Sequence, residues 1–294
     1  MAIRYCKTLT PGQIRAMHRL YNQSFQRIRT SESCFRARLG LEGEVNAVLE
    51  ERQGALLGYG LIEKNCLKVL AVAPEERGRG LGSALLRAAE EQICRRMPQA
   101  DRVLLGSGAG GYLMPGVPMK PENDASAWFA RRGYAPSWIS MDMIIDLETM
   151  PSIQMPQGVE LRWRCEQNPE EVLRSAECAE SVEKGWGDFY KKPGQRVLLA
   201  MEGRQIVGVN LVDQTLGVLY GESLPQAAGF GCLAVAEDHR DRGIGRALCL
   251  AAMEALKALG AEQCFIGYTY LENWYGKMGA RKYMGYWMGE KRLI

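Results

Sequence analysis

Hydrophobic positions near the start of the chain repeat with the period of a helix. Residues 10–13 read Thr-Pro-Gly-Gln, which is the form of a capping box with proline at the first helical position. Ile14, Met17 and Tyr21 follow on one helical face. The pattern therefore predicts an amphipathic helix that begins directly after residue 10.

The segments that follow have the composition of strands. Apolar residues 45–50 and 55–62 flank the polar residues 51–54, which predicts an antiparallel hairpin. Residues 66–72 form a further apolar strand, and Leu81, Leu85 and Ala88 then mark the buried face of a helix. Three more predicted elements complete this half: a strand over 102–105, a helix over 122–132 that ends at Gly133, and a strand over 138–145.

The second half repeats this order after a segment with two prolines, residues 150–158. We expect a domain over residues 1–149, a linker over 150–158 and a second domain over 159–294. The elements predicted in the second domain are a helix over 169–182, a hairpin of 197–201 with 206–212, a strand over 231–235, a helix from Ile244 that stops at Gly260, a strand over 264–268 and a helix over 271–278.

The two halves differ in length at two connections. The second half carries 13 extra residues within 213–228, and the first half carries 17 extra residues within 106–122. We expect both insertions to reach the edge of a cleft, where specificity usually resides. Tolerated surface loops are the alternative.

Each half joins a strand to a helix through a turn rich in glycine and arginine. Arg77, Gly80 and Gly82 of the first half recur as Arg240, Gly243 and Gly245, with the middle glycines 163 residues apart (243 − 80). Glycine lets the main chain approach an anion closely, and the helix start adds amide hydrogens and the positive end of its dipole. The pattern predicts a diphosphate ligand in both halves.

Both turns resemble the acetyl-CoA loop of the GNAT acyltransferases, whose pattern is Arg/Gln-x-x-Gly-x-Gly/Ala after a strand that ends in valine. The order of elements is also similar to that family, and the double layout is similar to that of the mycothiol synthases. The resemblance implies an α/β (mixed α+β) fold of two tandem domains, each a mostly antiparallel sheet flanked by helices. It also implies an N-acetyltransferase with acetyl-CoA as co-substrate and no metal. No Gly-Lys-Ser/Thr follows either turn, which disfavours an ATP site.

Carried onto this sequence, the resemblance assigns coenzyme contacts to both halves. In the first half these are Leu70, Val72, Arg77, Gly78, Arg79, Gly80, Leu81, Gly82 and Ser83. In the second half they are Leu233, Val235, Arg240, Asp241, Arg242, Gly243, Ile244, Gly245 and Arg246. The main-chain groups of the four strand residues would bind the pantetheine arm and polarise the carbonyl group.

The resemblance also indicates which half is catalytic. The family commonly protonates the departing thiolate with a tyrosine that lies four residues before a glycine early in the last helix. Tyr275 stands there in the second half, whereas the first half has Phe129, which has no proton to give. We therefore expect catalysis in the second domain. The first domain is either degenerate or binds the coenzyme, as a structural cofactor or in a second working site. Two alternatives remain: Tyr275 packs only as part of the helix face, or Tyr112 replaces the missing phenol in the first half.

The sequence does not assign a general base. The strand before the second turn carries no carboxylate, so Glu222 and Asp213 in the insertion, a water relay or an acceptor that arrives neutral all remain open. His239, beside Arg240, is expected to be a solvated neighbour of the turn.

Composition narrows the class of protein. Apolar residues make up 47% and charged residues 24% of the 294, and the net charge of +3 gives no reason to expect nucleic acid or membrane as a partner. Nine scattered cysteines suit a reducing cytoplasm, and two histidines argue against a Ser-His-Asp triad. The expected partner is a small-molecule or peptide amine, and the oligomeric state is open. The competing function is a non-catalytic acyl-CoA binder or sensor.

Overall fold

The computed structural model describes residues 2–106, 112–119, 125–217 and 220–293. By their contacts these residues form two compact units. Unit 1 comprises Met1–Met141, Leu219–Leu224 and Met284–Ile294, and unit 2 comprises Asp142–Val218 and Pro225–Tyr283. Most of the last strand of the chain therefore belongs to unit 1, and a six-residue piece of the 213–228 insertion does as well. The domain boundaries at 149 and 159 stay a prediction, because grouping by contacts does not define the extent of a domain in the sequence.

Unit 1 is built on a mostly antiparallel sheet. Its strands are β1 (Arg4–Cys6), β2 (Asn46–Arg52), β3 (Ala55–Glu63), β4 (Cys66–Val72), β5 (Arg102–Leu105), β6 (Val117–Met119) and the unit 1 parts of β7 (Ala135–Asp146) and β13 (Arg281–Arg292). They are ordered β1-β2-β3-β4-β5-β13-β7, with β6 on β13, and only β4 and β5 run parallel among the pairs with a described register. The hairpin of β2 and β3 and the strand over 66–72 are confirmed.

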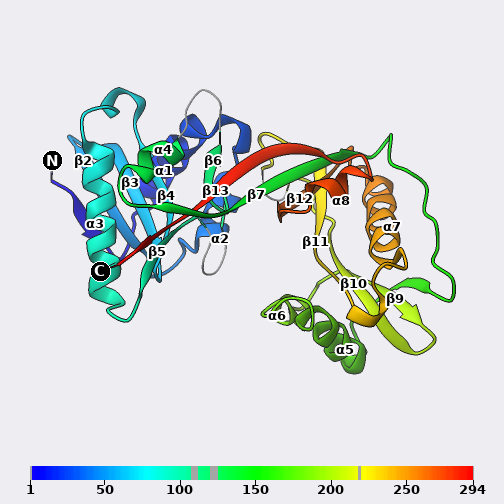
Figure 1. The fold of residues 1–294 in the computed structure, drawn as a ribbon. Coiled ribbons are helices and arrows are strands. Elements are labelled where there is room, and N and C mark those ends of the chain that lie inside the picture. The colour runs from blue at the N-terminus through cyan, green and yellow to red at the C-terminus, as the bar shows by residue number, and fades with distance from the viewer. Residues whose placement is uncertain (1, 107–111, 120–124, 218–219, 294) are drawn as a thin grey trace. The chain divides into compact units, whose positions relative to one another are not determined.

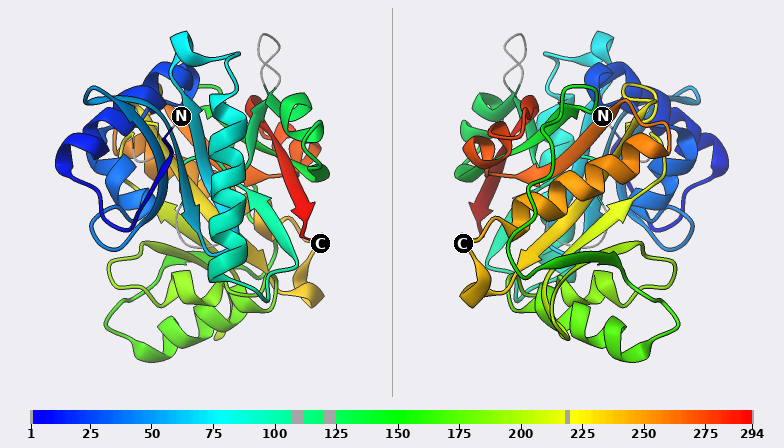
Figure 2. Two further views of the ribbon diagram at one scale, coloured as in Figure 1. Left: turned by 90° about the vertical axis from the view of Figure 1, so that its left-hand side faces the viewer. Right: turned by 90° about the vertical axis from the view of Figure 1, so that its right-hand side faces the viewer.

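The helices of unit 1 are α1 (Pro11–Ser24), α2 (Glu32–Leu39), α3 (Leu81–Arg96) and α4 (Ala125–Ala130), with a 3₁₀ turn η1 over Gln26–Ile28. The predicted capping box is confirmed, because Thr10 and Gln13 exchange backbone-to-side-chain hydrogen bonds of 3.0 and 3.2 Å. Helix α3 packs its buried side chains on the sheet. Figures 1 and 2 show the helix lying along the strands. The predicted helix over 122–132 ends earlier, at Ala130, and residues 107–111 and 120–124 lie outside the described residues.

Unit 2 repeats this plan. Its strands are the unit 2 part of β7 (Ala135–Asp146), together with β8 (Glu160–Trp163), β9 (Val197–Glu202), β10 (Gln205–Asp213), β11 (Ala227–Val235) and β12 (Gln263–Thr269). Their order is β7-β12-β11-β10-β9-β8. Its helices are α5 (Pro169–Glu180), α6 (Gly187–Tyr190), α7 (Ile244–Ala258) and α8 (Glu272–Gly276). Among the pairs with a described register, only β11 and β12 run parallel.

Neighbouring residues of β10 show how the sheet of unit 2 is covered. Val209 packs in a cluster with α5 and α6, whereas a Cβ on Gly208 would lie 3.0 Å from Leu248 of α7. Successive strand residues face opposite sides, so α5 and α6 cover one face and α7 the other (Figure 1).

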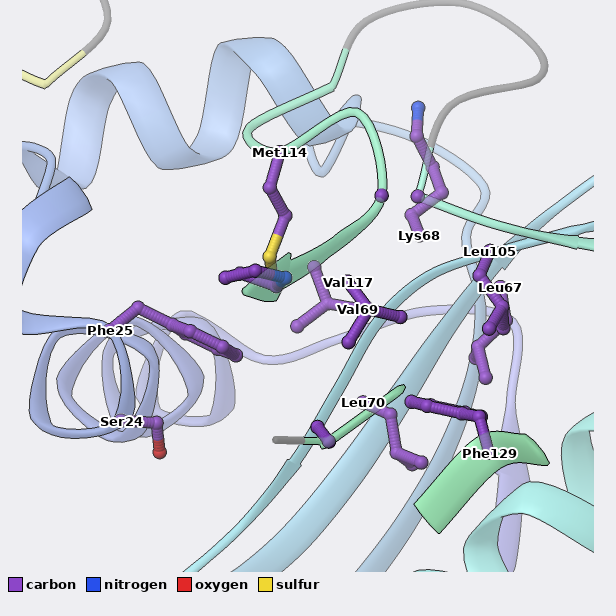
Figure 3. Close-up of a pocket in the computed structure, with 14 residues that line it drawn as sticks. Ser24, Phe25, Leu67, Lys68, Val69, Leu70, Leu105, Met114, Val117 and Phe129 are labelled. Atoms are coloured by element: carbon purple, nitrogen blue, oxygen red, sulfur yellow. The ribbon is translucent and has the colours of Figure 1, made fainter. Parts of the chain in front are cut away.

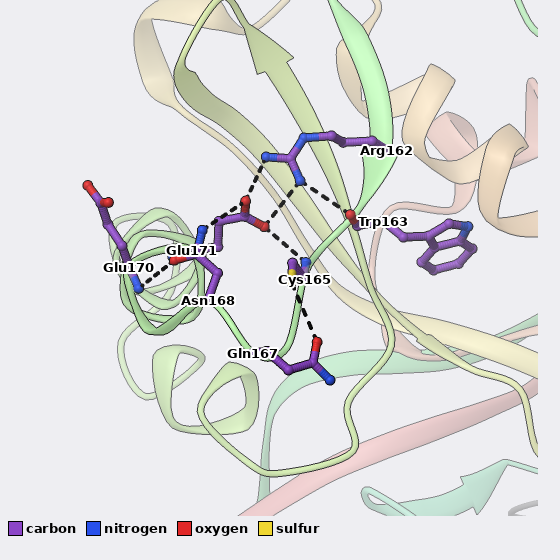
Figure 4. Close-up of polar contacts among 7 residues, drawn as sticks. All are labelled: Arg162, Trp163, Cys165, Gln167, Asn168, Glu170 and Glu171. Carbon is purple, nitrogen blue, oxygen red and sulfur yellow. Dashed lines mark hydrogen bonds and ion pairs between the residues drawn. The ribbon is translucent and has the colours of Figure 1, made fainter.

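The first turn of α5 is fixed by a polar network. Asn168 caps the helix by accepting a hydrogen bond of 3.1 Å from the Glu170 amide. Glu171 accepts hydrogen bonds from both Arg162 on β8 and the Cys165 amide, which joins the strand to the helix start (Figure 4). The Arg162 guanidinium beside it holds the pKa of Glu171 below its usual value, so this carboxylate stays charged.

Candidate active site

The two glycine–arginine turns have the same backbone form. A short 3₁₀ turn, η2 (Pro74–Glu76) or η3 (Glu237–His239), follows the strand, and a glycine then caps the next helix. Gly80 and Gly243 hold left-handed φ angles of 87° and 83°. Neither cap position provides a side-chain hydrogen bond to the helix, so the first amides of α3 and α7 are not occupied by a capping side chain.

The first arginine of each turn fixes the turn itself. Arg77 donates from Nε to the Val72 carbonyl at 3.0 Å, and Arg240 donates in the same way to Val235 at 3.3 Å. Both side chains remain exposed and keep donors for a ligand. The recurrence of this bond shows that the two turns are the same structure.

Charge is arranged differently around the second turn. Glu202 at the end of β9 binds Arg242 at 2.6 Å and His239 at 3.0 Å, and His239 also contacts Asp238 at 2.7 Å. His239 is 7% exposed, so the expectation that it is a solvated neighbour is wrong. Asp238, and to a lesser degree Glu202, raise the pKa of His239, because both carboxylates bind the charged ring.

Both sheets open beside the turn. Parallel pairing of β4 with β5 ends at Leu67 and Leu105, and β4 runs on to Val72. Pairing of β11 with β12 likewise ends at Gly229 and Phe265, and β11 runs on to Val235. Among the residues that the structure describes, the strand that leads into the turn therefore extends in both units beyond its pairing with the parallel neighbour.

Backbone alternation identifies the amides on this edge. The amide of Ala73 donates to Leu57 in β3, so the amides of Val72 and Leu70 face the opposite edge. In unit 2 the amide of Ala236 donates to Val207. By the same alternation the amide of Val235 faces the edge toward β12. Leu233 follows at a bulge in β11, at which Cys232 has a φ of 49°.

A tryptophan lies against the second glycine of each turn, which the sequence analysis missed. A Cβ on Gly82 would lie 3.4 Å from Trp128, and a Cβ on Gly245 would lie 3.5 Å from Trp274. The two tryptophans occupy matching positions in the last helix of each half, 146 residues apart (274 − 128). This repeated Trp-aromatic pair was the signal that could have identified them.

Tyr275 lies next to the open edge of unit 2. Its ring is 6.4 Å from that of Phe230, the first residue of β11 beyond the parallel pairing, and it is 7% exposed. Burial raises the pKa of the phenol well above its usual value, so the group is protonated at neutral pH. Within the described part of the chain its hydroxyl forms no hydrogen bond.

The matching place in unit 1 holds Phe129 at the wall of a cavity of about 90 Å³. The ring points toward Leu70 beside the open edge of β4, and Leu67 and Leu105 line the same space (Figure 3). Lys68 also lines it and forms an ion pair with Glu63. The cavity is therefore largely apolar, and the phenyl ring offers no proton there. Tyr112, the predicted substitute, is half-buried in unit 1, and its role stays a prediction.

The carboxylates considered as bases have other partners. Glu222 lies in unit 1, where it accepts a hydrogen bond of 3.1 Å from Asn22, and Asp213 accepts one of 3.1 Å from the Thr215 amide. Asp142, which the sequence analysis did not consider, is buried in unit 2 and accepts a hydrogen bond of 3.1 Å from the Tyr268 amide, which has a φ of 56°. Asp142 thus supports a strained strand end, and no base is assigned.

Two general features concern the described residues as a whole. All nine cysteines are free thiols, and buried Cys249 and Cys264 have pKa values raised by burial. Across residues 2–293, apart from the gaps given above, no helix combines the length and apolar character needed to cross a membrane.

Comparison with known proteins places a family domain in each half. Residues 8–109 and residues 193–279 each match a model described as an acetyltransferase (GNAT) domain. A search of curated protein sequences found no significant match.

Solved structures share the fold across nearly the whole chain. A glucosamine N-acetyltransferase region of a fungal multi-domain β-N-acetylglucosaminidase superposes with a TM-score of 0.82 at 19% identity, covering 98% of this chain. The chain spans only 38% of that protein's length. A GCN5-related N-acetyltransferase from Sphaerobacter thermophilus has a TM-score of 0.72 at 21% identity, covering 99% of this chain and 95% of its own. A tandem GNAT protein of the clavulanic acid pathway has a TM-score of 0.71 at 14% identity, covering 99% and 98% of the two chains.

Proposed function

Because this chain is a tandem member of the GNAT acetyltransferases, we propose that it transfers an acetyl group from acetyl-CoA to a primary amine of a small molecule or peptide. The family supports acyl transfer in general. The coenzyme, the kind of acceptor and the working unit are our proposals.

Both turns are proposed to bind the coenzyme. The uncapped amides that follow Gly80 and Gly243 would hold the diphosphate, with Arg77 and Arg240 adding charge. The pantetheine arm would lie along the unpaired strand edge, where the amides of Leu70 and Val72, or of Leu233 and Val235, donate hydrogen bonds to it and to the thioester carbonyl.

Unit 2 is proposed to carry out the reaction by direct transfer. The neutral amine attacks the carbonyl carbon, the amide donors stabilise the negative oxygen, and the carbon–sulfur bond then breaks. The departing thiolate takes the phenol proton of Tyr275, the amine loses its extra proton to solvent, and solvent returns a proton to the tyrosine. The observation that carries this assignment is the position of Tyr275 beside the open edge, with a hydroxyl that has no hydrogen-bond partner among the described residues, whereas unit 1 has Phe129 at the matching place.

Replacing the phenol tests the assignment. Tyr275→Phe should lower the rate of thiol release by about 100-fold, the lower end of general acid catalysis, while the affinity for acetyl-CoA stays unchanged. Calorimetry measures binding, and a thiol reagent measures turnover. The matched control is Phe129→Tyr, which should leave turnover unchanged. Normal turnover by Tyr275→Phe would remove the residue from the mechanism.

The competing function is a non-catalytic acyl-CoA binder. In unit 1 the observation that favours it is Phe129, which stands where unit 2 has the phenol of Tyr275. Thiol release with a panel of amines distinguishes the two functions for the whole chain. The panel should include glucosamine, because the fungal region is described as a glucosamine N-acetyltransferase, together with amino acids, aminoglycosides and peptides. Tight coenzyme binding, with no release of the coenzyme thiol in the presence of any of these amines, would establish the binder.

A further inference from the structure

The Arg132 side chain in unit 1 is fixed in position beside the first turn of α3. Its Nε and Nη2 donate to the Ser83 hydroxyl at 3.2 and 2.7 Å, and Nη1 donates to the Trp128 carbonyl at 2.7 Å. The guanidinium carbon stacks 3.7 Å from the centre of the Trp128 ring. Three hydrogen bonds and one stacking contact therefore fix the position of this side chain.

The cation so placed has no anionic partner among the described residues. Arg132 forms no ion pair with a carboxylate in this part of the chain, and neither do the nearby Arg87 and Arg131. Burial first, and then these two arginines, lower the pKa of Arg132, because nothing described there neutralises it. Positive charge gathered without a counter-charge favours binding of an anion.

The cluster adjoins the proposed diphosphate site without forming part of it. Ser83 is the third residue of α3, and the ring of Trp128 touches Gly82, the second glycine of the turn. The amides after Gly80 would hold the diphosphate, and Arg132 lies beside Ser83, further along the helix. Besides the diphosphate, the coenzyme has one more phosphate group, and this separate phosphate is the anion that could bind at Arg132.

Unit 2 supplies a cation at the corresponding place from a different element. Arg246 stands where unit 1 has Ser83, and Met278 stands where unit 1 has Arg132. One arginine is therefore kept beside the first helical turn of each half, once on the helix itself and once from the segment after α4. The two arginines thus come from different elements, and what the two units share at this place is a positive charge beside the helix start.

We propose that Arg132, oriented by Ser83 and Trp128, binds the 3′-phosphate of coenzyme A in unit 1. The inference rests on the proposed coenzyme binding by both turns, and it adds that the coenzyme is recognised through its phosphomonoester. Guanidinium groups bind phosphate oxygens through charge-assisted hydrogen bonds, and Arg132 keeps one N–H on each of Nη1 and Nη2 for this purpose.

The experiment compares coenzyme A with dephospho-coenzyme A by calorimetry on the full chain. A Gly245→Glu background places a carboxylate in the turn of unit 2, so that the remaining heat reports unit 1. In this background Arg132→Met should weaken binding of coenzyme A by about tenfold and leave dephospho-coenzyme A unchanged, as loss of a charged hydrogen bond implies. Arg95→Met, at the other end of α3, is the charge-matched control and should change neither affinity.

Two further variants keep the inference testable if Arg132→Met folds poorly. Arg87→Leu removes an exposed charge of the cluster and should weaken coenzyme A alone by about threefold. Ser83→Arg combined with Arg132→Met copies the pair of unit 2 and should restore the affinity. Equal losses for both coenzymes would assign Arg132 to the diphosphate and overturn the inference, as would no loss for either. If the unaltered chain bound neither coenzyme, the proposed function would fail with it.

Discussion

The two glycines of the second turn differ in whether the backbone would accept a side chain at their position. Gly243 has a φ of 83°, which a side chain adopts only with strain, whereas a Cβ on Gly245 would meet its neighbours at an ordinary 3.5 Å. Gly243→Ala should therefore lower the free energy of unfolding of unit 2 by roughly 1–2 kcal/mol. Thermal unfolding followed by calorimetry measures the change.

Gly245→Ala, two residues further on, is the matched control for this strain. It lies in the first turn of α7, where alanine is the better helix former, so the thermal midpoint should stay or rise slightly. Its Cβ instead intrudes on the approach to the amides, and affinity for the coenzyme should fall. Equal destabilisation by both substitutions would show that the left-handed backbone is not the cause.

At the scale of elements, the end of β9 and the turn η3 are joined by ionisable groups. His239 contributes stability in its charged form, because its pKa is raised by Asp238 and Glu202. That contribution is complete below the usual histidine pKa of 6.5 and is lost as the pH rises through the raised value. The pKa of Glu202 is lowered, chiefly by Arg242, so its contribution is present above 4.5 and lost in more acidic solution. The contact is therefore strongest between these two values.

The advantage of the unaltered protein over His239→Asn should thus shrink above pH 6.5. The measurement is the difference between the two thermal midpoints across pH 5.5 to 9. Asparagine keeps a polar side chain in the buried position, which limits the cavity that the substitution creates. A difference that stays constant with pH would show that the imidazole contributes through packing alone.

Elements whose signals are local were predictable from the sequence. Thr10 and Gln13 indicated the start of α1, and the glycine-rich turns with Gly80 and Gly243 indicated the starts of α3 and α7. Such signals are readable because caps and turns depend on a few neighbouring residues. Helix α2 was missed, since only Phe35 and Leu39 of its eight residues are buried and the stripe is too short to detect.

Pairing partners were not predictable in the same way. The pattern of a strand shows which residues face a core, but it does not show which distant strand lies beside it. The final strand is an example, because residues 284–294 belong with the first half by their contacts. The open edge of each sheet likewise depends on where two strands separate. The contact of Trp128 with Gly82 depends on the path of the chain between them.

At the scale of the whole molecule, the two halves share a turn but differ in the group beside the open strand. Gly82→Glu and Gly245→Glu each place a carboxylate at one turn, where it would repel a diphosphate. If both turns bind coenzyme, the unaltered chain should bind two molecules of coenzyme and each variant only one.

Because Tyr275 lies in unit 2 and Phe129 in unit 1, thiol release should be abolished by Gly245→Glu and kept by Gly82→Glu. Calorimetry and the thiol assay on the same samples compare the two outcomes directly. Loss of thiol release in Gly82→Glu, with unit 2 still occupied, would show that unit 1 takes part in the reaction and that the division of labour proposed for the two halves is wrong.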